Sequence, residues 1–298
     1  MRRVVESFVI ASLSLACSAG ADDAGSTEVG SSSSSTSSGV AGGTGEGGEA
    51  GVGGGFGFGG STGEGGGVAT VDEVYGHSPS VLYRLDPQTK QVTVIGSFSG
   101  CDSDVIDIAL DADSDMYATT FGGLHRVDRT TAVCTPIAGG SYPNSLSFVP
   151  AGTLDPNVEA LVGYQGSTYV RIDPNSGTIT SVGSIGGGYV SSGDIVSVKG
   201  GGTYLTVAGQ GCGDCLVEVN PSNGALVKNW GPVGHAQVFG LAFWGGRAYG
   251  FSNAGALFEV SFGSNDVTSV PIAVPNAPAG LQFWGAGSST SVPLVVPQ

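Results

Sequence analysis

Basic residues and charged residues of any kind are scarce in this sequence. Of its 298 residues, only ten are lysine or arginine against 25 aspartates and glutamates, and the formal net charge is −15. Because nucleic acid backbones are themselves anionic, this balance argues against a nucleic acid partner. Histidine occurs only three times and at distant positions, so a zinc site built from histidines and cysteines is not expected either.

The first apolar stretch, Val9 to Ala16, is too short to span a bilayer. It follows Arg2 and Arg3 and ends at Cys17, so that residues 1–16 resemble a bacterial lipoprotein signal peptide. The resemblance implies that residues 1–16 are removed and that Cys17 carries the lipid, including palmitate. It also implies a location at the outer membrane or cell surface of a Gram-negative bacterium. An ordinary secretory signal cleaved nearby is the alternative.

The next segment lacks the apolar side chains that a folded core needs. Residues 18–68 contain 20 of the 54 glycines, together with many serines, six acidic residues and no basic residue. Such a composition cannot offset the entropy of ordering, so lipidated Cys17 and this segment, residues 17–68, are predicted to form a disordered tether. A flexible coil of this length has an r.m.s. reach of about 40 Å, enough to hold a domain clear of a membrane. Residues 69–298 remain for one folded domain.

An internal repeat is the strongest pattern in that domain. Five segments with alternating apolar and polar residues share the form Leu-Tyr-Arg-Leu-Asp, and their last residues are spaced by 42, 45, 47 and 41 positions. They are Leu82–Asp86, Leu124–Asp128, Tyr169–Asp173, Leu216–Asn220 and Leu257–Ser261. The alternation indicates half-buried strands, and the turns that follow are rich in aspartate, asparagine, proline and glycine.

Each period contains three further candidate strands, one of which is more apolar than the rest. The apolar strands are predicted at 107–110, 145–148, 194–198, 240–243 and 280–283. Four strands in a period of this length are typical of a propeller blade, with the apolar strand lining the axis. The N-terminal copy lacks its first strand and the C-terminal copy lacks its second and third. The prediction is therefore all-β: one propeller of five four-stranded blades, in which the two chain ends share a blade.

The repeat resembles those of extracellular bacterial propellers of the NHL, YncE-like and WD40-like kind. The motif is Leu-Tyr/Phe-x-Ile/Val-Asp-Pro-x-Thr/Ser-Gly, followed by a strand, and residues 173–177 fit it well. The resemblance covers about residues 71–285, and the whole chain is similar to predicted surface lipoproteins. It implies a fold rather than an activity, since members of this wider group act as binding platforms, scaffolds, lyases or lactone hydrolases.

Four cysteines remain after Cys17. An even number in an exported chain predicts two disulfides. Cys212 and Cys215 lie in the sequence Gly-Cys-Gly-Asp-Cys and can close a small loop, which leaves Cys101 and Cys134 as the other pair.

Propeller ligands usually meet the face on which loops lead into the inner strands and second strands turn into third strands. Polar and aromatic residues in those loops are therefore the candidate ligand-binding residues. They are His77, Asp104, Tyr142, Asn144, Gln165, Tyr189, Gln210, His235, Gln237, Asn253 and Asn276. Aromatic rings beside amides suit sugars or peptides, although loops are also polar simply because water surrounds them.

The sequence contains no convincing catalytic constellation and predicts no bound cofactor. The nearest approach to one is His77 with His235, which could both face the channel mouth. Asp111, Asp113 and Asp115 have a spacing reminiscent of calcium loops but lack the glycine and glutamate of an EF-hand, so a solvated turn is favoured over bound Ca²⁺. Trp244 and Trp284 follow equivalent motifs, which indicates packing between blades.

Three functions are consistent with these features. The first is a monomeric, surface-anchored and non-enzymatic propeller that binds a glycan, peptide or protein, or serves as a scaffold. The second is a propeller hydrolase or lyase acting at the channel mouth. The third is a purely structural envelope protein, which would have no concave polar pocket.

Overall fold

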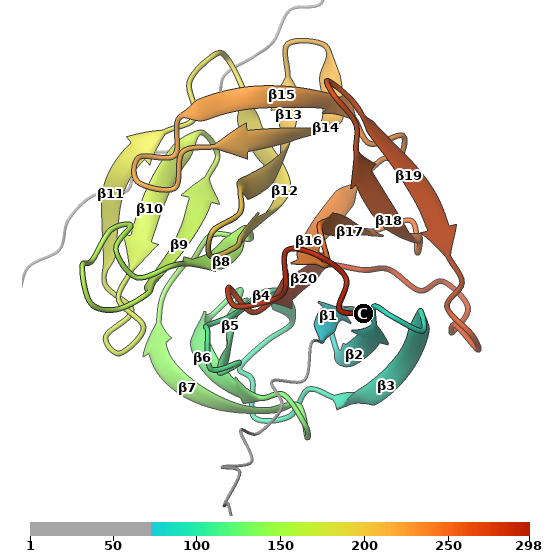
Figure 1. Cartoon of the computed structure of the whole chain (residues 1–298). Coiled ribbons are helices and arrows are strands. Elements are labelled where there is room, and N and C mark those ends of the chain that lie inside the picture. The colour runs from blue at the N-terminus through green and yellow to red at the C-terminus, as the bar shows by residue number, and fades with distance from the viewer. Residues whose placement is uncertain (1–72) are drawn as a thin grey trace, which may run out of the picture. The chain divides into compact units, whose positions relative to one another are not determined.

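A computed structural model describes residues 73–298, which form twenty β-strands and no helix. The strands make five four-stranded antiparallel sheets arranged in a ring (Figure 1). This confirms the predicted all-β propeller with five four-stranded blades. The predicted signal peptide, lipidated Cys17 and tether lie outside the described residues. Within residues 73–298, no helix exists that could cross a membrane.

Each blade runs from an inner strand at the axis to an outer strand at the rim. Blade 1 contains β20 (Gly285–Ser288), β1 (Val74–His77), β2 (Val81–Asp86) and β3 (Gln91–Ser97). Blade 2 contains β4 (Val105–Leu110), β5 (Met116–Thr120), β6 (Gly123–Asp128) and β7 (Val133–Gly139). Blade 3 contains β8 (Leu146–Val149), β9 (Ala160–Gln165), β10 (Thr168–Ile172) and β11 (Ile179–Ser184).

The last two blades follow in chain order. Blade 4 contains β12 (Val190–Ser197), β13 (Thr203–Gly209), β14 (Cys212–Val219) and β15 (Leu226–Pro232). Blade 5 contains β16 (Val238–Trp244), β17 (Arg247–Ser252), β18 (Leu257–Phe262) and β19 (Val267–Ile272). The five inner strands, β4, β8, β12, β16 and β20, contact one another in a closed ring around the axis. Apolar side chains of facing sheets form the core between the blades.

The two ends of the described chain share blade 1, as the repeat predicts. β20 pairs with β1 in antiparallel register, from Val74 opposite Ser288 to His77 opposite Gly285. The predicted inner strand at 280–283 is wrong, because the strand begins at Gly285 instead. At Gly285 a Cβ atom would overlap both His77 and the carboxylate of Asp107, so only glycine can occupy this place at the crowded axis.

Aspartate or asparagine starts the turn between the third and fourth strands in four of the five blades. The residues are Asp86, Asp128, Asp173 and Asn220, whose side-chain oxygens accept backbone N–H groups two or three residues later. Such Asx turns end the third strand and reverse the chain. Blade 5 has Ser261 in this place, and its turn is instead closed by a backbone hydrogen bond from Gly263 to Asp266. The turn chemistry of the repeat is therefore confirmed in four blades.

Both predicted disulfides are present. Cys101 and Cys134, whose Cα atoms are 5.0 Å apart, connect the loop before β4 to the outer strand β7 of the same blade. Cys212 and Cys215, 5.5 Å apart between Cα atoms, close a short loop at the start of β14.

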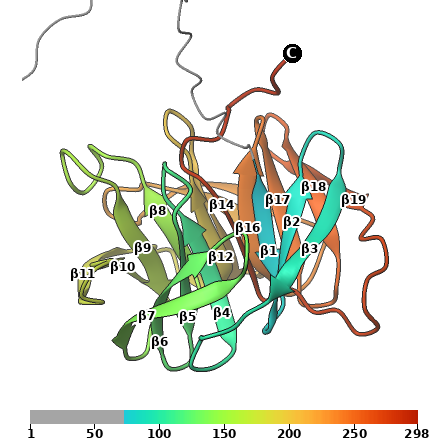
Figure 2. The ribbon, with the colours of Figure 1, turned by 90° about the horizontal axis from the view of Figure 1, so that it is seen from below.

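The described chain enters and leaves the propeller on the same face, because Val74 at the start of β1 lies opposite Ser288 at the end of β20. The segment after β20 then crosses this face (Figures 1 and 2). It accepts backbone hydrogen bonds from Lys199 at Thr290 and from Gly245 at Pro293, both at 2.8 Å. The opposite face carries the loops that lead into the inner strands.

Candidate functional site

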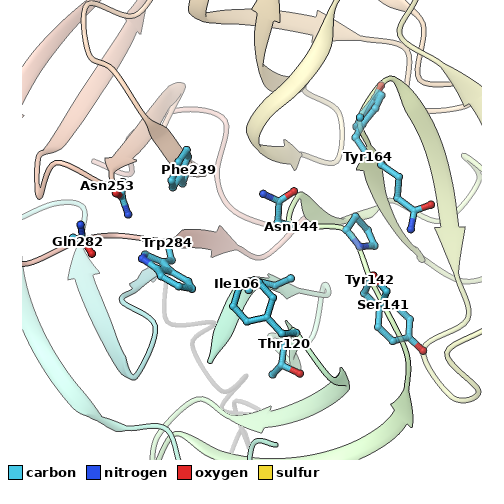
Figure 3. Close-up of a pocket in the computed structure, with 14 residues that line it drawn as sticks. Ile106, Thr120, Ser141, Tyr142, Asn144, Tyr164, Phe239, Asn253, Gln282 and Trp284 are labelled. Atoms are coloured by element: carbon cyan, nitrogen blue, oxygen red, sulfur yellow. The ribbon is translucent and has the colours of Figure 1, made fainter. Parts of the chain in front are cut away.

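A pocket of about 670 Å³ opens at the axis on the face opposite the chain ends (Figure 3). Its floor is built from residues at or just before the start of the inner strands: Ile106, Asn144, Phe239 and Trp284. Its walls come from the turns between second and third strands and from the lead-in loops, as the general geometry of propellers predicts. This is the concave polar pocket that a purely structural envelope protein would lack.

Two kinds of side chain dominate the lining. Aromatic rings come from four blades and are Phe121, Tyr142, Tyr164, Phe239 and Trp284. Carboxamides come from three blades and are Asn144, Gln165, Asn253 and Gln282. None of the lining residues carries a charge, although the surrounding domain is acidic. The pocket therefore offers aromatic faces and neutral hydrogen-bonding groups.

The rings of the two tyrosines are buried in the core between blades, and their hydroxyls are held by the protein. Tyr142 donates to the carbonyl of Gly177 at 3.0 Å, and Tyr164 donates to the carbonyl of Gly224 at 2.6 Å. Burial raises the pKa of both phenols, so both remain protonated near neutral pH. These hydroxyls position the rings and are not free to react.

Phe121 and Trp284 form an edge-to-face pair at the pocket, with ring centroids 6.1 Å apart and planes at 84°. Phe121 is 65% exposed, in the turn between β5 and β6. The predicted equivalence of Trp284 and Trp244 is wrong, because Trp284 precedes β20 while Trp244 ends β16 and is buried. Trp284 instead occupies the place that Phe239 has in blade 5.

Some of the predicted ligand-binding residues meet at this pocket. Tyr142, Asn144, Gln165 and Asn253 all line it. Sequence reasoning missed Phe121, Phe239, Gln282 and Trp284, because the candidates were chosen for polarity and because the last inner strand was placed too early. The signal that could have found Phe239 and Trp284 is the large ring directly before a glycine at the start of the inner strand, Gly240 in β16 and Gly285 in β20.

Six further candidates, from lead-in loops and from the turn between β13 and β14, do not line the pocket. These residues are Asp104, Tyr189, Gln210, His235, Gln237 and Asn276. Tyr189 accepts a hydrogen bond from the amide of Asn229 at 3.1 Å, away from the axis. Gln237 has a left-handed backbone, with φ of 57°, and its backbone N–H donates to the carboxylate of Asp214 at 2.8 Å. Gln237 thus shapes the loop without reaching the pocket.

The two histidines that could have formed a catalytic pair point to different places. His77 is fully buried, and its Nδ1 lies 2.9 Å from the carbonyl oxygen of Ser78. Burial lowers the pKa of His77 to about 4, so its ring is neutral near neutral pH. His235 stacks on Phe258 with ring centroids 3.8 Å apart, and partial burial lowers its pKa.

The sheet of blade 5 separates these histidines. The ring of Phe258, on which His235 stacks, covers Gly250 on one face of that sheet. The neighbouring Phe251 points to the other face, because side chains alternate along a strand, and there it packs against Gly76 of blade 1. The prediction that His77 and His235 share the channel mouth is therefore wrong.

Two buried carboxyl groups lie directly below the pocket floor, on Asp107 and Asp194. Asp107 accepts backbone N–H groups from Ile108 at 2.9 Å and Leu146 at 2.7 Å. Asp194 accepts from Ile195 at 2.6 Å and Leu241 at 2.8 Å. Burial raises the pKa of both carboxyls well above the usual range, and for Asp107 the nearby Asp194 raises it further.

These bonds join neighbouring inner strands. Asp107 of blade 2 binds Leu146 of blade 3, and Asp194 of blade 4 binds Leu241 of blade 5. Every oxygen of the pair accepts a backbone N–H, so the two side chains hold the ring of blades together. Neither residue lines the pocket.

The aspartate run in the turn between β4 and β5 forms an Asx turn. Asp111 accepts the backbone N–H groups of Asp113 at 3.0 Å and Asp115 at 2.9 Å. Within residues 73–298, no group of three or more histidine, cysteine or acidic side chains is placed to hold a metal ion. The sequence-based suggestion of Ca²⁺ at these three aspartates remains a prediction without support from this geometry.

Comparisons with known proteins find likeness at the level of fold. No protein-family model matches the sequence, and no curated protein matches it. Solved structures that match include hydrazine synthase from Kuenenia stuttgartiensis, at 12% identity and a TM-score of 0.39, covering 66% of this chain and 61% of that one. The present chain thus spans less than two thirds of the length of that protein.

Two further solved structures are similar at the same level. One comes from a study of the de novo evolutionary emergence of a symmetrical protein, at 14% identity and a TM-score of 0.47, covering 76% of this chain and all of that one. The other is the PQQ-bound aldose sugar dehydrogenase from Streptomyces coelicolor, at 15% identity and a TM-score of 0.38, covering 67% and 77%. At these identities and scores the matches carry no inference about activity, and the five paired sheets themselves establish the propeller.

Proposed function

We propose that this chain is a non-enzymatic binding propeller, anchored to the outside of a bacterial cell, that takes its ligand in the axial pocket. The observation that carries the proposal is the pocket itself, with aromatic rings and four carboxamides converging from several blades. Pockets of this size and mixed character are the usual sites at which proteins bind small molecules or ligand termini.

The chemistry of the lining supports binding rather than turnover. The lining contains hydroxyl groups on Thr120, Ser141 and Tyr142, and none of the lining residues is a histidine or an acid. The Thr120 hydroxyl donates to Asp102 at 2.6 Å, and the same Asp102 oxygen lies 3.6 Å from His125 Nε2. Thr120 is however fully buried, and its oxygen also accepts the backbone N–H groups of the next turn, so this hydroxyl is held in place by the fold. General acid–base catalysis requires an acid or a base within hydrogen-bonding reach, directly or through one water. The two acids below the pocket floor, Asp107 and Asp194, have their oxygens committed to backbone N–H groups.

The direction of the chain supports display at a surface. Residue 73 and the segment after Ser288 both leave from the face opposite the pocket. If Cys17 is lipidated and residues 17–68 act as a flexible tether, the pocket is presented away from the membrane. The same proposal has the chain acting as a monomer without a nucleic acid partner, which is in keeping with an acidic domain and an uncharged pocket.

Binding is tested with the full chain carrying Cys17→Ala, which removes the lipid attachment site. The protein is screened by calorimetry or surface plasmon resonance against neutral and acidic oligosaccharides, peptidoglycan fragments and short peptides. We expect binding that the double variant Asn144→Ala/Gln165→Ala weakens at least tenfold. Asn276→Ala, an exposed residue away from the pocket, is the matched control and should leave affinity unchanged.

Three results would contradict the proposal. They are an absence of binding across all these compounds, binding that the pocket double variant does not alter, and chemical conversion of a bound compound. Anchoring is tested separately: the wild-type chain should partition with membranes in the exporting cell, whereas Cys17→Ala should be released.

A further inference from the structure

The Phe121–Trp284 pair leaves aromatic surface open to solvent at the wall and floor of the pocket. Phe121 is 65% exposed, and its nearest aromatic neighbour is Trp284 across the blade 1–blade 2 boundary. The two residues come from parts of the chain far apart in sequence, so their approach is produced by ring closure. An exposed aromatic surface beside a pocket commonly marks a binding surface.

The four carboxamides of the pocket have unused hydrogen-bonding capacity. Within residues 73–298, the side chains of Asn144, Gln165, Asn253 and Gln282 are not hydrogen-bonded to other protein groups. Each amide offers an acceptor oxygen and a donor NH₂ group. Figure 3 shows Asn253 and Gln282 on the side of Trp284, with Asn144 across the pocket from them.

We infer that the ligand is an uncharged saccharide whose ring stacks on one aromatic face of the edge-to-face Phe121–Trp284 pair while its hydroxyls bind the carboxamides. This inference rests on the proposed function, because it names the ligand class for the same pocket. A sugar has C–H groups on its ring faces and hydroxyls around its edge, each of which both donates and accepts. Aromatic faces and free carboxamides complement these two features respectively.

Charge decides against acidic sugars and basic peptides. The lining contains no lysine or arginine to pair with a carboxylate, sulfate or phosphate, and the surrounding domain is acidic. The lining also contains no carboxylate to pair with a basic side chain. An ionised ligand would therefore lose its hydration in this pocket without gaining an opposite charge.

The backbone at the axis decides against an extended peptide. A peptide that adds to a sheet needs a free strand edge. Each inner strand is paired with its second strand, and its other edge faces the neighbouring inner strands in the closed ring. The pocket thus offers side chains but no sheet edge, which favours recognition of hydroxyls over recognition of a peptide backbone.

The test measures binding of neutral oligosaccharides, uronic-acid-containing oligosaccharides and short uncharged peptides to the full chain with Cys17→Ala. We expect at least one neutral saccharide to bind and to change the tryptophan fluorescence. Phe121→Ala should weaken that binding about tenfold, and Trp284→Ala should weaken it by at least as much, with Trp284→Tyr partly restoring it. Val270→Ala, which truncates another exposed apolar residue, is the control and should bind as the wild type does.

The folding of each variant is checked by thermal unfolding, because Trp284 also packs at the axis. Phe121 is exposed, so Phe121→Ala removes the aromatic ring without disturbing the core and separates loss of stacking from loss of structure. Binding of acidic saccharides alone, or of peptides alone, to the same pocket would overturn the saccharide inference but leave the proposed binding function intact. Binding of neutral sugars that neither aromatic variant weakens would overturn the stacking inference. If none of the compounds binds, both proposals fail.

Discussion

The polar groups at the axis of this propeller fall into two layers that differ in one respect. In the lower layer, the oxygens of Asp107 and Asp194 accept backbone N–H groups from four inner-strand residues. In the upper layer, carboxamides such as Asn144 and Gln282 face the pocket with no protein partner in the described chain. Both layers are built by the inner strands and the loops beside them.

The comparison teaches that hydrogen-bonding commitment separates structural from binding groups better than charge does. Asp107 and Asp194 are buried acids with raised pKa values, which is a common mark of a functional site, yet their hydrogen bonds join neighbouring blades. The neutral carboxamides above them have hydrogen-bond donors and acceptors that no group of the described chain occupies. Changes in the lower layer should therefore alter stability, and changes in the upper layer should alter binding.

The largest expected effect is on stability, from Asp194→Ala. The variant leaves the buried N–H groups of Ile195 and Leu241 without acceptors and opens a cavity at the axis. We expect the free energy of unfolding to fall by about 3 to 5 kcal/mol, measured by urea denaturation. Asp104→Ala, an exposed acid of the lead-in loop before β4, is the control, and equal losses in the two variants would contradict the structural role.

The second effect concerns acid and comes from His77, which is buried next to Asp107 beside Gly285. His77 has a pKa of about 4 in the folded protein against an ordinary value of 6.5, because burial disfavours its cation. As the pH falls from 6.5 to 4, the unfolded chain gains a proton that the folded chain does not, so this residue lowers stability by up to about 3 kcal/mol.

His77→Gln isolates that contribution. The carboxyls of Asp107 and Asp194 act in the opposite direction, because their raised pKa values let the folded state take up a proton as the pH falls. Unfolding free energies of wild type and variant are therefore compared at pH 7 and pH 4. The advantage of the wild type should shrink by up to about 3 kcal/mol, and a pH-independent difference would refute burial of a neutral histidine.

The third effect distinguishes the two disulfides. Cys101–Cys134 closes a much longer stretch of chain than Cys212–Cys215, with sequence separations of 33 and 3. In the chain-entropy treatment, replacing the first pair with serines costs about 4 kcal/mol and replacing the second about 2 kcal/mol, measured by thermal unfolding. The ranking would be wrong if the shorter loop gave the larger loss.

The short disulfide should also affect the pocket. Asp214, between its two cysteines, holds the N–H of Gln237, whose carbonyl accepts the N–H of the pocket residue Asn253 at 2.8 Å. Ligand affinity should therefore fall a few-fold in Cys212→Ser/Cys215→Ser.

The smallest effect on stability is expected in the upper layer. Gln282→Ala and Asn144→Ala remove amides that hold nothing in the protein, so the free energy of unfolding should change by less than about 0.5 kcal/mol. Each should nonetheless weaken ligand binding several-fold by calorimetry. A stability loss comparable to that of Asp194→Ala would erase the distinction between the two layers.

Much of the fold was predictable because its signals are local. The alternation in Leu82–Asp86 and its copies, and the Asx turns that begin at Asp86, Asp128 and Asp173, depend on residues a few positions apart. The start of β20 was misplaced because residues 280–283 imitate the motif at 240–243. The choice between two glycine-led segments depends on which one fits between His77 and Asp107.

The site was predictable only in part. Loop position indicated Tyr142, Asn144, Gln165 and Asn253, because propeller geometry brings those loops to one face. It could not exclude His235, whose stacking on Phe258 depends on a packing choice within blade 5. It also missed Trp284, which reaches the axis only because the chain closes its ring one segment later than the motif suggests.

The amino-acid sequence alone determined the strand period, the turns, the five-bladed ring, the shared blade and the pairing of four cysteines. These features follow from alternation, turn chemistry and count, which act over short stretches of chain. Tertiary structure decided which polar groups at the axis are hydrogen-bonded within the protein and which remain available to a ligand. Asp107 with Asp194, and Phe121 with Trp284, meet only when the ring closes, and burial together with hydrogen bonding then assigns one pair to structure and the other to the pocket.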